Sequence, residues 1–403
     1  MFSSIFYNFK RKERDFLMNN KKEVLWSYNF IILSLINFFL TLLFLLLNST
    51  MTDYVINNFS STTSQAGFVV GIFIIGSLIG RIVTGQANHS KKLLCIGLIL
   101  FTLTTLLYFL NYGVNFLIIS RLLNGITFGI VSTIIGTTVA VTIPPSRKGE
   151  GISYFAVSTA LATGLGPFIG AYLSTNSDFI TIFKFCSLLG LISLIIGSFV
   201  NFPTLHSSNK NNDNKFKLSN IVEVKALSIS IIVFCMTFCF SGVISYINVY
   251  AKELSLTKAA SYFFIVYTII VLISRPFTGR IVDKKGARFI IYPAFILFST
   301  GLFLLSFTQN SLMLLSSSAL IALGFGNLSS ISQTVAINST TPNRMGLATA
   351  TFFIFYDLGS GFGPSILGSI ISLTSYSSLY LILGVLVLVI LIIYLIFIHK
   401  KVK

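Results

Sequence analysis

Twelve apolar stretches, each about 20 residues long, make up most of this 403-residue chain. A helix rises about 1.5 Å per residue, so about 20 residues cross a hydrocarbon core of ~30 Å. Runs this long and continuous are typical of helices, because barrel strands are short and alternate in polarity. The sequence therefore predicts an all-α membrane protein with twelve transmembrane helices. The stretches are 28–47, 64–84, 93–110, 116–140, 152–173, 180–200, 226–249, 260–279, 289–308, 312–337, 347–370 and 377–398.

The composition excludes a water-soluble protein. Hydrophobic residues make up 54% of the chain and charged residues only 10%, whereas soluble domains carry about 25% charged residues. In a soluble chain, the net charge of +17 would suggest nucleic-acid binding. The position of the charges along the chain argues against that interpretation.

Nearly all of the 28 Lys and Arg residues fall on one side when the twelve stretches are threaded in and out of a membrane. Only Lys184, Lys252 and Lys258 fall in the connections on the other side. Such an excess marks the cytoplasmic face. We therefore expect a multi-pass protein of the cell membrane with both termini in the cytoplasm, and no nucleic-acid partner.

An internal repeat divides the chain into two halves. Residues 145–167 and 342–364 align without a gap at a spacing of 197, and eight of the 23 positions are identical. Each copy follows the fourth helix of its half, so the halves have the same topology. The repeat predicts two pseudo-symmetric six-helix bundles. The predicted segments are a cytoplasmic N-terminal segment (1–27), a first bundle (28–200), a polar cytoplasmic linker (201–225), a second bundle (226–398) and a cytoplasmic tail (399–403).

Two parallel six-helix repeats resemble the major facilitator transporters. The stretch GRIVDKKGAR is similar to that superfamily's loop between the second and third helices of a half. This resemblance implies a gating motif made of Gly279, Asp283, Lys284, Gly286 and Arg288. The corresponding loop of the first half lacks the aspartate, which puts its gating role in doubt.

A Gly-x-Gly-Pro element in the fifth helix resembles the antiporter motif of the drug:proton branch. It contains Gly164, Gly166, Pro167 and Gly170, and the repeat places Gly361, Gly363 and Pro364 in the second half. The resemblance implies a role in preventing leak between the two sides. Ordinary close packing of helices is the alternative. The chain is also similar to small bacterial exporters of quinolones and of opine-type metallophores.

Two ionisable residues lie well inside the apolar stretches, Arg121 and Asp357. An intramembrane charge costs at least about 2.5 kcal/mol, so it normally faces a cavity or a partner. The repeat places Ser318 and Ala160 at the equivalent positions, so neither charge follows from the duplication. Arg121, together with Asn124, resembles the branch's intramembrane arginine motif. This likeness implies proton coupling or binding of an anionic group, and a structural ion pair is the alternative.

Asp357 is a candidate proton carrier, because a carboxylate in a low-dielectric medium favours its protonated form. The alternative is a neutral, hydrogen-bonded acid that packs its helix. Asn37 lies at mid-depth in the first helix and either lines a cavity or forms an interhelical hydrogen bond.

The gating motif is predicted to act as a cytoplasmic latch. Asp283 is expected to accept hydrogen bonds from the N-terminus of the helix at 347–370 and from Arg288. Arg81 and Arg275 each lie four residues before a glycine of the two loops. They either pair within the latches or remain solvated at the membrane interface.

These features predict a proton-coupled exporter of a small organic molecule that works by alternating access. The cargo is a hydrophobic drug or an anionic or zwitterionic metabolite of the metallophore kind. A proton-coupled uptake symporter shares the fold and is the alternative. We expect a monomer without a cofactor. No metal site is expected, since the four Cys and three His residues form no ligand cluster. An enzyme is not expected, and the sequence has no nucleotide-binding loop.

Overall fold

A computed structural model describes residues 25–61, 63–85, 90–201 and 222–398, and within these ranges every regular element is helical. The segment 1–24, the loop 86–89, most of the predicted linker (202–221) and the tail 399–403 lie outside the described residues. The helices are α2 (Tyr28–Phe59), α3 (Thr63–Gly85), α4 (Lys91–Leu106), α5 (Val114–Thr142), α6 (Lys148–Asn176), α7 (Phe179–Ser198), α9 (Val224–Glu253), α10 (Thr257–Lys285), α11 (Arg288–Ser306), α12 (Ser311–Ile321), α13 (Asn327–Asn338), α14 (Met345–Leu373) and α15 (Tyr376–Ile393).

Polar side chains define where many of these helices begin. Ser27, Ser90, Asp178, Asn310 and Ser375 each accept a hydrogen bond from the backbone two or three residues into the following helix. Such caps satisfy backbone donors that have no partner inside the helix. The helices therefore start at the polar ends of the apolar stretches.

The twelve predicted spans are all present. Eleven helical segments are long and apolar enough to cross a membrane, and α14, at 29 residues, packs against α3 and α9. One of the twelve spans is made of α12, a π-helical turn at Ala322–Gly326, and α13. The prediction of an all-α, twelve-helix membrane fold is confirmed.

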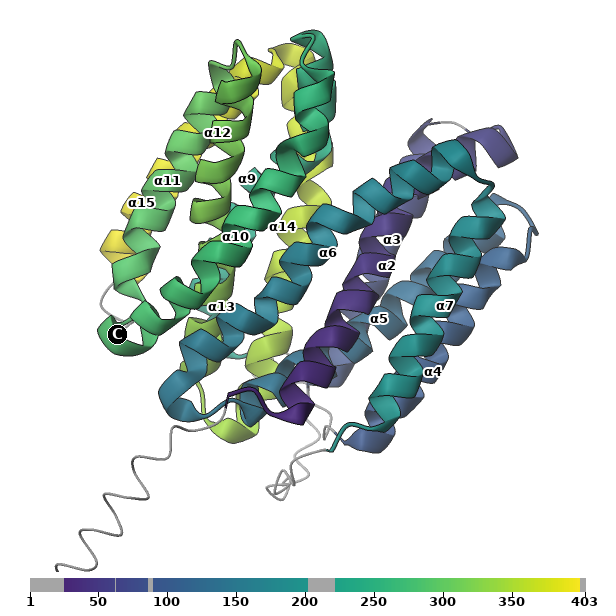
Figure 1. Ribbon diagram of the computed structural model, residues 1–403, viewed down its shortest axis with the longest axis horizontal. Coiled ribbons are helices and arrows are strands. Elements are labelled where there is room, and N and C mark those ends of the chain that lie inside the picture. The colour runs from purple at the N-terminus through teal and green to yellow at the C-terminus, as the bar shows by residue number, and fades with distance from the viewer. Residues whose placement is uncertain (1–24, 62, 86–89, 202–221, 399–403) are drawn as a thin grey trace, which may run out of the picture.

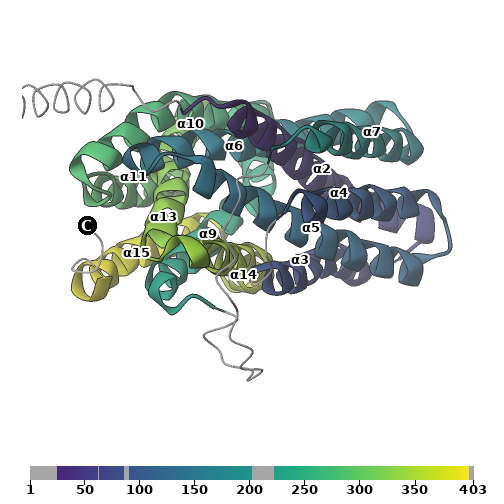
Figure 2. The same ribbon diagram turned by 90° about the horizontal axis from the view of Figure 1, so that it is seen from below.

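The spans form two bundles, α2–α7 and α9–α15, which lie side by side (Figures 1 and 2). Each bundle has its own buried apolar cluster. The main contacts between the bundles join α6 to α10 and α3 to α14. These pairings are equivalent under the internal repeat, as expected for two halves related by a pseudo-twofold axis.

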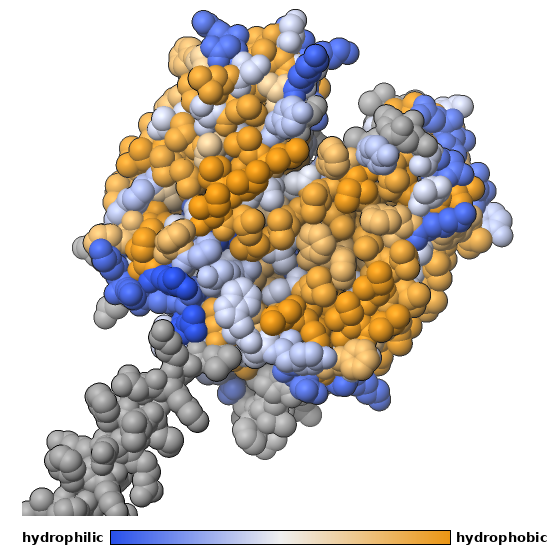
Figure 3. Space-filling view, in the orientation of Figure 1, coloured by the Kyte–Doolittle hydropathy of each residue, from blue (hydrophilic) through white to orange (hydrophobic). Residues whose placement is uncertain are grey.

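The bundles meet at one end and diverge at the other (Figure 1). The end where they meet contains residues 145–150, 279–288 and 342–347, and we call it the basic end. At the opposite end, the surface is hollowed between the two bundles, while apolar side chains cover the flanks (Figure 3). The molecule is therefore closed at the basic end and open at the other.

Glycines allow α3 and α5 to approach each other closely. A Cβ atom added at Gly80 would lie 2.1 Å from the carbonyl oxygen of Ile126, and one at Gly76 would lie 2.3 Å from that of Leu122. Gly125 and Gly129 of α5 meet the backbone of α3 in the same way. This contact places Arg81 of α3 beside Ser132 of α5, which matters for the site described below.

Replacing Gly80 with alanine should therefore destabilise the first bundle. Because the added methyl group forces α3 away from α5, the free energy of unfolding should fall by about 1–3 kcal/mol. The change can be measured as a lower melting temperature by circular dichroism in detergent. Gly71→Ala is the matched control, since a Cβ there meets nothing within 4 Å. Equal melting temperatures for the two variants would contradict the argument.

Candidate functional site

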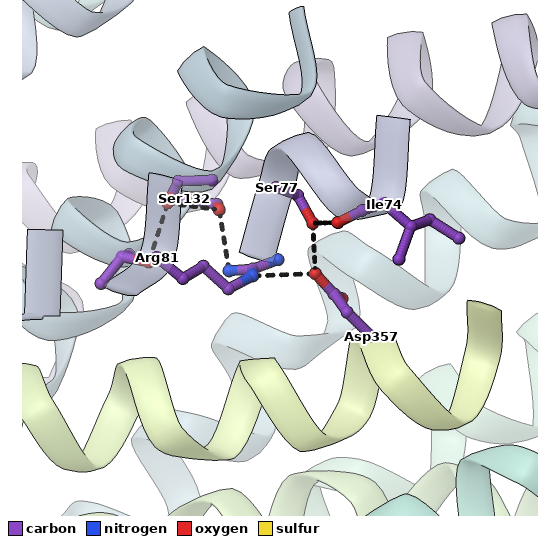
Figure 4. A network of polar contacts seen from close by, with 7 residues as sticks. Ile74, Ser77, Arg81, Ser132 and Asp357 are labelled. Carbon is purple, nitrogen blue, oxygen red and sulfur yellow. Dashed lines mark hydrogen bonds and ion pairs between the residues drawn. The ribbon is translucent and has the colours of Figure 1, made fainter. Parts of the chain in front are cut away.

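An ion pair joins the two bundles near the middle of α14. The Nε atom of Arg81, on α3, lies 2.9 Å from Oδ2 of Asp357, on α14. The same carboxylate oxygen accepts a hydrogen bond of 2.6 Å from Ser77, and Nη1 of Arg81 donates to Ser132 at 3.0 Å. Figure 4 shows these residues converging from three helices. We call this group the central ion pair.

The surroundings of the central ion pair are apolar and aromatic. The Arg81 guanidinium lies over the rings of Phe353 and Phe128, with centroid distances of 4.6 and 5.8 Å. The Arg81 side chain is only 3% exposed, whereas Asp357 is 17% exposed. A buried carboxylate is stabilised by a paired cation and strongly destabilised when that cation leaves. Because the partners belong to different bundles, the pair exists only while the bundles are close together.

The sequence predicted Arg81 and Asp357 as separate candidates, one for gating and one for proton transfer. The structure brings them together. Arg121, by contrast, lies entirely within the first bundle. Its Nε donates to the carbonyl of Val69 at 3.4 Å, and its guanidinium lies 4.8 Å from the ring of Phe73. Both terminal nitrogens of Arg121 are buried without a hydrogen-bond partner among the described residues.

Asn124 and Asn37 make hydrogen bonds inside the first bundle. The amide of Asn124 donates to Thr104 and Thr105 of α4, and its oxygen accepts from Tyr108 at 3.1 Å. Asn37 of α2 donates to Ser158 and Thr159 of α6 at 2.8 and 3.1 Å. The geometry of Asn37 corresponds to the interhelical hydrogen bond, one of its two predicted roles.

At the basic end, Asp283 joins α10 to the first bundle. Its two carboxylate oxygens accept hydrogen bonds from the backbone nitrogens of Gly149 and Glu150, at 2.6 and 2.8 Å. These nitrogens belong to the first turn of α6, where unpaired donors and the helix dipole favour a negative charge. The prediction that the N-terminus of α14 donates hydrogen bonds to Asp283 was wrong. The pseudo-twofold axis places α10 beside α6, so the latch crosses to the other half.

Glu150 adds an ionic contact to the same place. Its carboxylate lies 2.7 Å from Arg280 of the second bundle and 2.7 Å from Arg147 of its own. Neither Glu150 nor Arg280 was among the predicted residues. The signal available was the i,i+3 spacing of Arg147 and Glu150 at a helix start, which favours an ion pair.

The glycines of the gating motif have steric explanations. A Cβ at Gly279 would lie 2.7 Å from the Cα atom of Glu150, so only glycine allows α10 to approach α6 there. Gly286 ends α10 with φ of 89°, a conformation that side chains other than glycine rarely adopt. The neighbouring Lys284 is exposed, and Arg288 is the first residue of α11.

The glycines of the Gly-Pro elements contact two different surfaces. Gly164 and Gly361 face the opposite bundle, where an added Cβ would lie 2.4 Å from Thr268 and 3.0 Å from Ile74, respectively. Pro167 lies inside α6.

The remaining glycines of these elements pack within one bundle. Gly166 and Gly170 meet α2, and Gly363 meets Ser241 of α9. Pro364 lies inside α14, and its carbonyl accepts a hydrogen bond from Tyr246. The elements therefore serve both packing within a bundle and contact between bundles.

Arg275 of α10 is buried in the second bundle. It is 4% exposed, and Nη2 donates to the carbonyl of Gly326 at 3.1 Å. Across the described ranges, Nε and Nη1 of Arg275 have no hydrogen-bond partner. The same residues contain no group of three or more His, Cys, Asp or Glu side chains arranged to hold a metal ion.

Comparisons with known proteins agree with this architecture. The family model described as Major Facilitator Superfamily matches residues 33–364, with a further match at residues 293–403. An MFS-type transporter of Methanocaldococcus jannaschii is 27% identical over 332 residues, which cover 79% of this chain and 85% of that protein. Multidrug resistance protein 2 of Bacillus subtilis is 24% identical over 326 residues, covering 77% of this chain and 80% of that protein.

Solved structures show the same fold. The crystal structure of the MFS transporter FucP in the outward conformation superposes with a TM-score of 0.72 at 16% identity. The superposition covers 94% of this chain and 100% of that one.

Removing the Asp283 carboxylate should loosen the basic end. Asp283→Ala deletes two hydrogen bonds, each contributing about 1 kcal/mol, so the ratio of separated to closed basic ends should rise by about thirty-fold. After the native cysteines are replaced, spin labels are attached at positions 92 and 343. Lys92 and Asn343 are exposed on opposite bundles. Double electron–electron resonance should then report longer distances between the labels. Lys284→Ala is the control, because that side chain is exposed. An unchanged distance distribution in Asp283→Ala would exclude the latch.

Proposed function

This chain belongs to the major facilitator superfamily, whose members are transporters, and from that premise we propose that it exports a small organic molecule in exchange for protons. The observation that carries the proposal is the ion pair between Arg81 and Asp357, which links a titratable group to the contact between the bundles. We further propose that the basic end faces the cytoplasm.

The proposed coupling follows from the electrostatics of the central ion pair. While Asp357 is ionised, the guanidinium of Arg81 stabilises its charge and holds the bundles together. A proton that enters from the open end and binds the carboxylate removes that attraction. The basic end is then free to separate.

Release of the proton resets the cycle. With the basic end open, the site exchanges with the cytoplasm, where cargo binds and the proton leaves. The ionised Asp357 pairs with Arg81 again, the basic end closes, and the cargo is exposed at the open end. Protons therefore move inward and cargo moves outward. The side chain of Asp357 is 17% exposed in the conformation described here, which supports its proposed role in taking up a proton.

The cargo that fits these surroundings is small, partly apolar and aromatic. Phe353, which is partly exposed, lies against Arg81, and rings of this kind favour planar or cationic partners. The similarity to a multidrug resistance protein points in the same direction. We propose a drug-like compound or a zwitterionic metabolite as cargo.

Asp357→Asn should abolish proton-driven transport. Asparagine is close in size but cannot be ionised, so the pH-driven accumulation of norfloxacin or ethidium in proteoliposomes should fall at least about ten-fold, to the level of protein-free vesicles. Asp178→Asn is the matched control. Its side chain caps α7, and asparagine caps a helix equally well.

The direction of the gradient separates the two modes of coupling. An antiporter accumulates cargo in vesicles with an acidic interior, because protons leave as the cargo enters. Accumulation only in vesicles with an alkaline interior would instead indicate the uptake symporter. Wild-type transport by Asp357→Asn would remove Asp357 from the mechanism.

A further inference from the structure

Arg275 holds a buried positive charge that the central ion pair does not use. Its side chain is 4% exposed, and only Nη2 has a hydrogen-bond acceptor, the carbonyl of Gly326. Nε and Nη1 are buried without a partner in the described part of the chain. A guanidinium presents five donors in a planar fork that matches a carboxylate. Leaving two nitrogens of Arg275 buried and unpaired costs free energy, and a bound ligand with hydrogen-bond acceptors would remove that cost.

The internal repeat shows what Arg275 lacks. Arg275 and Arg81 are separated by 194 residues and occupy equivalent places in α10 and α3. Two reciprocal contacts support this alignment. Gly164 of α6 meets Thr268 of α10, and the equivalent Gly361 of α14 meets Ile74 of α3.

The carboxylate that pairs with Arg81, and the serine that donates to that carboxylate, are both missing on the Arg275 side. Ser77, which donates to the carboxylate in the central ion pair, is replaced by Val271 at the same spacing of 194. Asp357 is replaced by Ala160 at the spacing of 197 that relates α6 to α14. Ala160 packs into the apolar cluster of the second bundle. The α6–α10 side of the pseudo-twofold axis therefore has the cation, Arg275, but has no acid at the place of Asp357.

Neighbouring groups suit an incoming anion. The carbonyl that holds Arg275 belongs to the π-helical turn Ala322–Gly326, and such turns occur frequently at functional sites. The phenol groups of Tyr267 and Tyr356 lie within electrostatic reach of the guanidinium. A phenol donates a hydrogen bond to a carboxylate readily.

The position of Arg275 also gives it a route of access. Thr268, two turns before Arg275 in α10, donates to the carbonyl of Ala160 in α6 at 3.3 Å. This contact lies between the bundles, so it is lost when the basic end separates. Opening of the basic end would then uncover the α10 face beside Ala160, on the side from which an exporter loads.

We propose that Arg275 binds a carboxylate of the transported molecule, at the place that corresponds to Asp357 on the other side of the pseudo-twofold axis. The inference rests on the proposed function, and it names the cargo class as organic carboxylates. The guanidinium forms a bidentate, charge-assisted contact with the two carboxylate oxygens. The carboxylate thereby supplies the negative charge that is absent at Ala160, on the α6–α10 side of the pseudo-twofold axis.

Paired ligands test the proposal directly. Norfloxacin, benzoate and indole-3-acetate are each titrated against their methyl esters, with purified wild-type protein in detergent and isothermal titration calorimetry. The wild type should bind at least one acid at least about ten-fold more tightly than its ester. In Arg275→Gln, whose folding is checked by circular dichroism, this preference should disappear. The absence of any acid-over-ester preference in the wild type would overturn the proposal.

A second variant leaves Arg275 in place. Ala160→Asp puts a carboxylate where the repeat predicts it, so Arg275 gains an internal partner and the bound acid is displaced. Ester binding should be unchanged. Ala160→Asn is the matched control of the same size, and it should keep the acid preference. An acid preference that survives in Ala160→Asp, or that both variants lose equally, would contradict the proposal.

Failure of the two proposals can be told apart. Acid binding that depends on Arg275, together with transport that ignores the pH gradient, contradicts proton coupling and leaves the carboxylate site intact. Transport that is driven by the gradient and abolished by Asp357→Asn, but equal for acid and ester in the wild type and in Arg275→Gln, contradicts the carboxylate site alone.

Discussion

The salt bridge between Arg81 and Asp357 links the contact between the two bundles to a titratable group. It lies in an apolar environment, where separating two opposite charges is expensive and neutralising one of them is comparatively cheap. A single proton on Asp357 therefore changes the energy of the contact between the bundles far more than a proton on a solvated surface acid would. The stability of this interface therefore depends on the protonation of Asp357, whereas apolar packing alone does not respond to protons.

Close contact between helices makes that salt bridge possible. Glycines at the α3–α5 contact bring Ser132 within 3.0 Å of Arg81, and Gly361 lets α14 approach α3. At the basic end, Gly149 and Gly279 do the same for α6 and α10. Larger residues would hold the helices apart and lengthen the ionic contacts that they carry. The ionic contacts between the helices therefore depend on the small residues beside them.

The sequence was sufficient to predict the fold, because hydrophobic length, charge placement and an internal repeat are all properties of the chain alone. It identified Arg81, Asp357 and Asp283 as individual residues. It did not predict their partners, since Arg81 and Asp357 are 276 residues apart and meet only through the packing of two bundles. Asp283 was assigned to the wrong helix for the same reason. Arg121 resembles a family motif, yet its depth inside the first bundle depends on helix rotation, which periodicity in an almost wholly apolar helix does not define.

Duplication followed by divergence accounts for the difference between the two sides of the pseudo-twofold axis. Both halves keep an arginine in equivalent places, at Arg81 and Arg275, but only α14 keeps an acid, and α6 has Ala160 instead. A symmetric protein with two internal pairs would hold the bundles together twice and would leave neither Arg81 nor Arg275 available to a ligand. With an acid on one side only, a single ion pair of this kind joins the bundles, and Arg275 has no carboxylate at the place of Asp357. In the proposed mechanism, the Arg81–Asp357 pair responds to protons, and Arg275, on the other side of the pseudo-twofold axis, recognises the cargo.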